Sequence, residues 1–265
     1  MAARSMWNGK LGVGKLGIDV KLYAAVEDVA IHFHLLHARD EERVQQHMLN
    51  PNTGEVREAD QIQKGYEVQR GTFVLLSPAE LAKLAPAPSK SIELYAFVPA
   101  SQLTPVWYER PYHVGPSGKS PEYFALARVL SERGLVGLAR WVMRKHAYHG
   151  ALRAHGDYLT LSTLHSAEEV VAAPRVAPAS RAADAKELAM AEQLVEALAG
   201  EFDPAEFKDE HRERVLELIQ AKARGKKLKL PPRPRARAAK PLASALERSL
   251  KMVQRQQHGK ERLSA

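Results

Sequence analysis

Alternating apolar and polar positions in about the first hundred residues predict β-strands. Ile18–Leu22 and Ile31–Leu35 alternate strictly, as strands with one buried face do, and Thr72–Leu76 and Ile92–Val98 repeat the pattern. Turn-forming residues separate these runs, and the segment 50–54, which reads NPNTG, suits the tip of a long hairpin. Many short strands with few helices favour a barrel or a sandwich.

After these strands the spacing of apolar residues changes to a helical period and then returns to a period of two. Ser120 and Pro121 predict a helix start with an N-cap and a first-turn proline, and Gly134 predicts its end. The expected buried face of this helix comprises Tyr123, Phe124, Ala127 and Leu130. Two strands, Val136–Met143 and Asp157–Leu164, are expected to end the β-rich part.

The last third of the chain is expected to be helical and then irregular. Residues 172–180 have the composition of a linker, and a helix whose apolar face includes Leu188, Ala191, Leu194 or Val195, and Leu198 ends at Gly200. Asp203 and Pro204 predict a second helix that runs to about Ala223. We therefore expect a mixed α+β chain with a β-rich core over residues 1–175, a helical arm over 184–223 and a tail over 224–265.

The positive charge of the protein is concentrated in that tail. The whole chain has 39 Lys and Arg against 31 Asp and Glu, but residues 222–265 hold 14 of the basic residues and only 2 of the acidic ones. The segment 225–241, which reads GKKLKLPPRPRARAAKP, is Pro-rich and predicted to be disordered on its own. A basic tail on a mildly acidic body indicates a polyanionic partner, nucleic acid first and an anionic membrane second, or else only a solubilising extension.

Composition also excludes several kinds of protein. Without cysteine the chain has no disulfide, thiolate metal site or cysteine nucleophile. The longest apolar run, Leu22–Val26, is too short to span a bilayer, and the N-terminal residues lack the apolar region of a secretory signal. We expect a cytoplasmic protein that does not enter a membrane.

Two motifs that suggest bound cofactors are rejected on their context. Gly9–Lys15 has the glycine and lysine spacing of a P-loop, but Leu16 replaces the required Ser or Thr, and the segment that follows alternates like a strand. His32, His34 and His37 suggest a metal site, although the neighbouring acids are equally typical of an ordinary surface. No catalytic arrangement of side chains is found, so we expect neither an enzyme nor a cofactor or metal.

Basic and polar residues in the body form two groups that suit contacts to phosphate and sugar. The first group falls on the expected long hairpin, a segment that we take to lack large apolar residues; an exposed, charge-balanced arm is the equally open alternative. It comprises Arg39, Arg43, Gln45, His47, Arg57, Lys64 and Arg70. The second comprises Arg140 and Arg144, with Lys145 beside them. The tail adds Lys226, Lys227, Lys229, Arg233, Arg235 and Arg237.

Several short motifs, in this order along the chain, resemble the bacterial Ku proteins of non-homologous end joining. The resemblance covers roughly residues 5 to 223, and the tail resembles only the basic extensions of some members. The motifs are Val20–Tyr23, Phe33–Asp40, Lys64–Val68, Ser89–Glu93, Phe97–Pro99, Arg110–His113, Glu187–Ala191, Phe202–Pro204 and Lys208–Arg214.

The resemblance implies a Ku-type β-barrel with a long bridge at about residues 39–70, followed by helical arms. It further implies a homodimer that closes a ring around the ends of linear double-stranded DNA, at the nucleoid, and that recruits the ATP-dependent DNA ligase D through the C-terminal helices. Two other functions stay open from the residues alone. One is a general architectural DNA binder that acts through its tail, and the other is a DNA-modifying enzyme with an unrecognised site.

Overall fold

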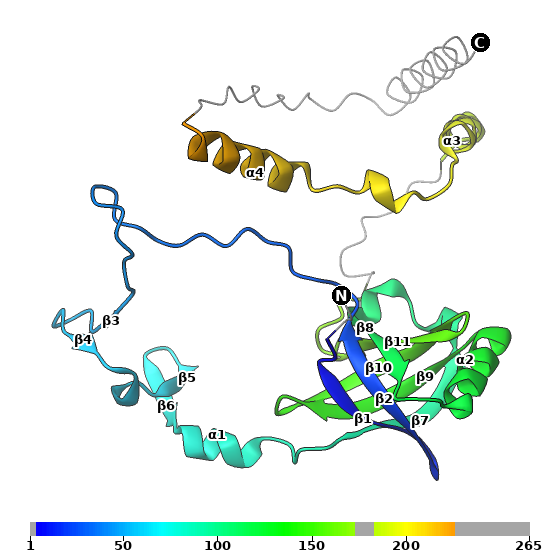
Figure 1. Ribbon diagram of the computed structural model, residues 1–265, viewed down its shortest axis with the longest axis horizontal. Helices are drawn as coiled ribbons and strands as arrows, with labels where there is room; N and C mark the ends of the chain where they lie inside the picture. The colour runs from blue at the N-terminus through cyan, green and yellow to red at the C-terminus, as the bar shows by residue number, and fades with distance from the viewer. Residues whose placement is uncertain (1–3, 173–182, 226–265) are drawn as a thin grey trace. The chain divides into compact units, whose positions relative to one another are not determined.

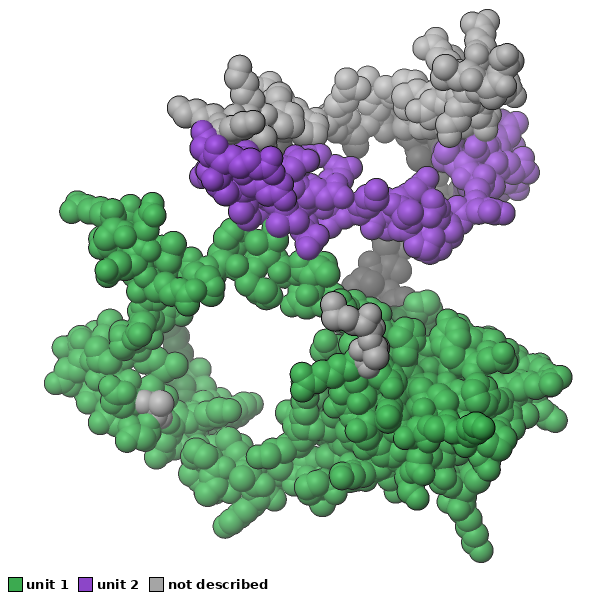
Figure 2. Space-filling view, in the orientation of Figure 1, with its two compact units in different colours: residues 1–172 green, residues 173–265 purple. Residues whose placement is uncertain are grey.

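The computed structural model describes residues 4–172 and 183–225. The chain divides into two compact units, residues 1–172 and 173–265, which are coloured separately in Figure 2. Each unit is described by itself below.

A closed β-barrel forms the body of the first unit (Figure 1). Its seven strands are joined in the order β1-β2-β8-β11-β10-β9-β7, and every pair is antiparallel except β1 with β7, whose parallel pairing closes the barrel. This confirms the predicted α+β class and barrel, and the alternative of a sandwich is wrong. The strands are β1 (Trp7–Val13), β2 (Leu16–Ala24), β7 (Ser91–Pro99), β8 (Tyr108–Pro116), β9 (Leu135–Met143), β10 (His146–His155) and β11 (Tyr158–Leu164).

Helix α2 (Pro121–Arg133) packs on the barrel and completes its core. The helix begins at Pro121 and ends where Gly134 adopts a positive φ of 61°, as the sequence predicts. Tyr123, Ala127 and Leu130 are buried against strand residues such as Leu152 and Leu161. Phe124, expected on the same face, is about half exposed. Two 3₁₀ helices, η2 (Ala100–Gln102) and η3 (Pro105–Trp107), connect β7 to β8.

The hydroxyl of Tyr123 connects two barrel strands through hydrogen bonds. It donates to the carbonyl of Val114 on β8 and accepts the N–H of Leu159 on β11 at 2.9 Å. Val114 and Leu159 are themselves partners in the β8–β11 ladder. Burial raises the pKa of the Tyr123 phenol, which keeps the hydroxyl protonated and able to donate.

Residues 25–90, here called the arch, form the long connection between β2 and β7. In Figure 1 this segment runs away from the barrel before it returns, and in Figure 2 it is a thin part of the first unit. Its regular elements are short: β3 (Met48–Leu49) pairs with β4 (Val56–Arg57), β5 (Lys64–Gln69) pairs with β6 (Thr72–Leu76), and η1 (Ala59–Gln61) and α1 (Pro78–Leu84) complete it. Thus the bridge contains two short hairpins where the sequence predicts one long one.

One predicted strand in the arch is wrong. Residues 31–35 alternate in sequence but form no strand, because most of their side chains are exposed and the neighbouring segment reaches only their end, where Leu35 accepts the N–H of Val44 at 3.1 Å. Alternation predicts a strand only where one face is buried. By contrast, the NPNTG segment does lie at the tip of the β3–β4 hairpin.

The second unit contains two helices in its described part. Helix α3 (Ala185–Leu198) begins with a capping box in which Asp184 and Glu187 exchange hydrogen bonds with each other's backbone N–H. Helix α4 (Glu210–Ala223) begins later than predicted: residues 204–206 form only the 3₁₀ helix η5 (Pro204–Glu206). Asp209 supplies the N-cap of α4 by accepting the N–H of Arg212.

Replacing Tyr123 with Phe should destabilise the barrel. The substitution keeps the ring but removes the hydroxyl, which is the hydrogen-bond partner of both a buried carbonyl and a buried N–H. We therefore expect the free energy of unfolding to fall by about 1–3 kcal/mol. Chemical denaturation measures this, with Tyr95→Phe on the exposed face of β7 as the matched control. An unchanged unfolding midpoint for Tyr123→Phe would contradict the assignment.

Candidate nucleic-acid interface

The strand register places both ends of the arch at one end of the barrel. Leu22, near the end of β2, lies opposite Trp7 at the start of β1, and Ser91, the first residue of β7, lies opposite Lys10. Trp141 on β9 pairs with Ile92, so the two-residue turn between β9 and β10 extends beyond the start of β7. We call this side of the barrel the arch end.

The arch exposes an unusual amount of apolar surface. None of its described side chains is buried, and the large apolar ones are mostly more than half exposed. The expectation that this segment lacks large apolar residues is therefore wrong, because apolar side chains alternate along it with the predicted cations. The exposed residues include Phe33, Leu35, Met48, Leu49, Tyr66, Phe73, Leu75 and Leu84.

The β5–β6 hairpin presents apolar side chains on both of its faces. Gly65 lies opposite Leu75, and its missing side chain leaves room for Phe73 and Leu75 to cover that face together. Tyr66 and Val74 form a pair on the other face. A two-stranded hairpin exposed in this way is marginal in water by itself. This hairpin therefore has the character of an interface that a partner covers.

The predicted arch cations are separated along the arch and do not converge on one point. Arg39 lies in a turn, Arg43 forms a β-bridge with Leu36, and Arg70 lies in the β5–β6 turn. Gln45 and His47 occupy the irregular segment before β3, and Lys64 begins β5. Arg57 forms an ion pair with Glu55 at 2.6 Å. Within residues 4–172 and 183–225 the other four cations, Arg39, Arg43, Lys64 and Arg70, form no ion pair. The arch as a whole has seven Lys and Arg against ten Asp and Glu.

His37, one of the arch histidines, has a local structural role. His37 Nδ1 lies 2.8 Å from Asp40 Oδ2, and the Asp40 carboxylate also accepts the N–H of Glu42. Together these hydrogen bonds lower the pKa of Asp40, the backbone bond most and the His37 bond next. Among the described residues no group of three or more His, Asp or Glu side chains could hold a metal ion.

The second predicted basic group lies on the β9–β10 hairpin. Arg140 pairs with Glu93 on the neighbouring strand β7, with 2.8 Å between Nε and Oε2. Arg144 and Lys145 form the turn itself, at the arch end. Residues 135–155, from β9 through β10, include four Lys and Arg and no acidic residue. The barrel thus contributes a locally more basic segment than the arch does.

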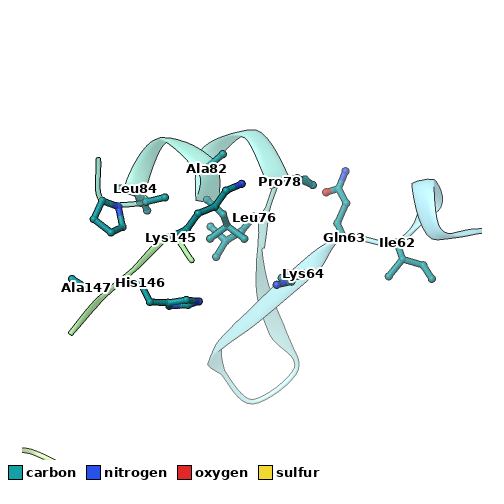
Figure 3. Close-up of a pocket in the computed structure, with 13 residues that line it drawn as sticks. Ile62, Gln63, Lys64, Leu76, Pro78, Ala82, Leu84, Lys145, His146 and Ala147 are labelled. Atoms are coloured by element: carbon teal, nitrogen blue, oxygen red, sulfur yellow. The ribbon is translucent and has the colours of Figure 1, made fainter. Parts of the chain in front are cut away.

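A pocket of about 680 Å³ lies between that turn and the returning part of the arch (Figure 3). Apolar side chains from β6 and α1, such as Leu76 and Leu81, form part of its wall. Its charged or titratable lining residues are Lys64 from β5 and Lys145 and His146 from the barrel, and no acidic residue lines it. The pocket therefore brings basic groups from both parts of the first unit together.

The described part of the second unit has a different chemistry. Leu188, Val195 and Leu198 form an exposed apolar stripe along α3, and the rings of Phe202 and Phe207, both exposed, lie 5.0 Å apart near η5. Residues 183–225 have six Lys and Arg against eleven Asp and Glu. This composition favours a protein partner over a polyanion.

The predicted tail contacts, from Lys226 to Arg237, lie outside the described residues. The described helices include none with the length and apolar character needed to cross a membrane.

Comparison with known proteins defines the class of this fold. The family model described as the Ku70/Ku80 β-barrel domain matches residues 12–190. The protein named "Non-homologous end joining protein Ku 2" of Geotalea uraniireducens is 36% identical over 258 residues, which cover 96% of this chain and 100% of the relative. The protein named "Non-homologous end joining protein Ku" of Koribacter versatilis is 35% identical over 261 residues, or 97% of this chain and 89% of the relative.

A further relative has a similar identity. A protein of the same name from Coxiella burnetii is 34% identical over 228 residues, 84% of this chain and 83% of the relative. The chain belongs to the Ku family.

Proposed function

We propose that this chain binds the ends of linear double-stranded DNA as a homodimer and recruits the ATP-dependent DNA ligase D to them in non-homologous end joining. The observation that carries the proposal is the arch, a long exposed segment that leaves and re-enters one end of the barrel and has both apolar and basic side chains. The relatives named for non-homologous end joining give the process. The protein itself makes and breaks no bond.

A second copy of the chain is the proposed cover for the arch hairpins. Exposed apolar side chains occur on both faces of the β5–β6 hairpin, so a partner that packs on one face leaves the other exposed. Two arches that wrap around each other would cover both faces. Self-complementary contacts of this kind are typical of two-fold dimers. Two arches joined in this way close a loop with the two barrels.

Closure of that loop explains selectivity for ends without base recognition. A closed dimer cannot pass onto an uninterrupted duplex from its side, and it must be threaded from a free end. Contacts are to phosphates, so binding is independent of sequence and weakens with salt. We assign these contacts to Arg39, Arg43, Gln45, His47, Arg57, Lys64 and Arg70 on the arch, to Arg140 and Arg144 on the barrel, and to the tail residues Lys226, Lys227, Lys229, Arg233, Arg235 and Arg237.

The apolar stripe of α3 is the proposed contact for the ligase. Its acidic surroundings are unsuited to DNA, and its exposed Leu and Val side chains have the chemistry of a helix that docks into an apolar groove.

A competition between DNA forms tests end binding. A labelled linear duplex is bound at moderate salt and challenged with unlabelled linear DNA or with covalently closed circles of the same sequence. We expect only the linear competitor to displace the protein. Equal competition per base pair by closed circles would refute the proposal and favour a general architectural binder.

The same assay tests the dimer when the hairpin is altered. Phe73→Asp together with Leu75→Asp places charge on one apolar face, so we expect a monomer by light scattering and the loss of the preference for linear DNA. Leu16→Asp, at an apolar and about half-exposed position at the other end of the barrel, is the control and should stay dimeric. A dimeric Phe73→Asp/Leu75→Asp variant would show that the hairpin is not the interface.

Ligase recruitment is tested on α3 separately from end binding. Leu188→Asp with Val195→Asp should abolish stimulation of ligase D on linear DNA and leave the affinity for DNA ends unchanged, because the stripe lies on the acidic unit. Gln193→Asp, on the opposite side of the helix, should stimulate like the unaltered chain. Full stimulation by the double variant would contradict the assignment of this stripe.

A further inference from the structure

The turn between β9 and β10 has a backbone conformation that its residues disfavour. Met143 pairs with His146, so Arg144 and Lys145 alone form the loop, with φ of 51° and 66°. Positive φ at both positions is the type I′ pattern, for which Asn-Gly is strongly preferred. Arginine and lysine have Cβ atoms that crowd the backbone there.

The other two-residue turns of the chain avoid this cost. Each has one positive φ and places a glycine at it: Gly14 between β1 and β2, Gly71 between β5 and β6, and Gly156 between β10 and β11. Outside the β9–β10 turn, Glu41 is the one non-glycine residue with a positive φ in residues 4–172 and 183–225. The β9–β10 turn is therefore the exception within its own barrel.

The strained residues are two cations that lack a counter-charge. Within the described part of the chain neither Arg144 nor Lys145 forms an ion pair or a side-chain hydrogen bond. No acidic residue occurs in the whole β9–β10 hairpin, and Arg140, its other arch-end cation, is already paired with Glu93. The type I′ geometry suits the twist of the hairpin, but neither side chain gains a partner among the described residues, which leaves both cations available to a ligand of opposite charge.

The position of the turn indicates the ligand. The register places it at the arch end, and Lys145 lines the acid-free pocket together with His146 and with Lys64 of the arch (Figure 3). Figure 3 shows Lys145 reaching toward α1 and β6 across this pocket. Basic groups from the barrel and the arch thus converge on one side of the first unit.

We propose that the strained Arg144–Lys145 turn is a phosphate clamp, which with Lys64 holds the DNA backbone at the arch end of the barrel. The inference rests on the proposed function and identifies this turn as an element whose stability is lowered in favour of binding. The clamp adds Lys145 to the proposed phosphate contacts. The positive-φ backbone of the turn holds the side chains of Arg144 and Lys145 in place. A turn optimised for folding would have neither cation.

The distinguishing experiment relaxes the turn. In the full-length chain, Arg144→Asn with Lys145→Gly supplies the preferred type I′ sequence and removes both charges. We expect the melting temperature to rise by a few degrees, while the slope of log affinity against log salt on a linear duplex becomes smaller in magnitude by about 2 per protomer. Arg144→Gln with Lys145→Gln removes the charges and keeps the strain, so it should lose the same slope without the rise in melting temperature.

Lys15→Gln with Lys119→Gln is the matched control. These two exposed lysines lie at the other end of the barrel, so removing them should leave the salt slope close to that of the unaltered chain. An equal loss in this control would show a general effect of net charge and overturn the clamp. Undiminished binding by either turn variant would overturn it as well, as would a fall in melting temperature on relaxing the turn, since the conformation would then be required for packing.

The outcome is separable from that of the proposed function. If closed circles compete with linear DNA for the unaltered chain, end binding fails whatever the turn variants do. If only linear DNA competes and the turn variants keep the full salt slope, end binding stands and the clamp alone fails.

Discussion

The parallel pairing of β1 with β7 is the constraint from which the other features of the first unit follow. It joins two strands separated in sequence by β2 and the whole arch, and it closes the barrel. Because β2 runs antiparallel to β1 while β7 runs parallel to it, the chain must leave β2 and enter β7 at the same end. The two ends of the arch are therefore held close together on the barrel, and its middle is free to extend. A shift of this register would move the base of the arch, and with it the adjacent turn at Arg144 and Lys145.

The exposed surface of the arch is the reason for the proposal that a second copy covers it. Hairpins such as β5–β6 have too few neighbours to bury their apolar side chains, and the barrel core is already filled by strand side chains and by Tyr123, Ala127 and Leu130 of α2. The apolar surface that remains exposed is a cost to the isolated chain, of the order of 25 cal/mol for each Å² that a partner would cover. In the proposed dimer that cost is a driving force for association, and the scattered cations of the arch would contribute more to steering and to phosphate contact than to stability.

The sequence predicts much of the barrel because its strands satisfy local rules. Residues 18–22, 92–98 and 136–143 alternate or run apolar, and residues on one face of each are buried in the structure, while Gly134 ends α2 as its position indicates. The strand expected at 31–35 fails because alternation carries no information about whether a buried layer exists. The interface was harder to predict: the exposure of Phe73 and Leu75 depends on tertiary placement, and the strain at Arg144 and Lys145 depends on the pairing of Met143 with His146. The motifs that resemble Ku proteins indicate a barrel with a long bridge, which local patterns do not specify.

Topological trapping tests the enclosure of DNA most directly. The protein is loaded on a linear duplex, the ends are then joined to make a closed circle, and the complex is washed at a salt concentration that removes ordinary phosphate contacts. Enclosure predicts that the dimer stays on the circle through this wash and leaves when one restriction cut restores an end. Release from the closed circle at the same rate as from linear DNA would contradict enclosure and, with it, the account of how the arch selects DNA ends.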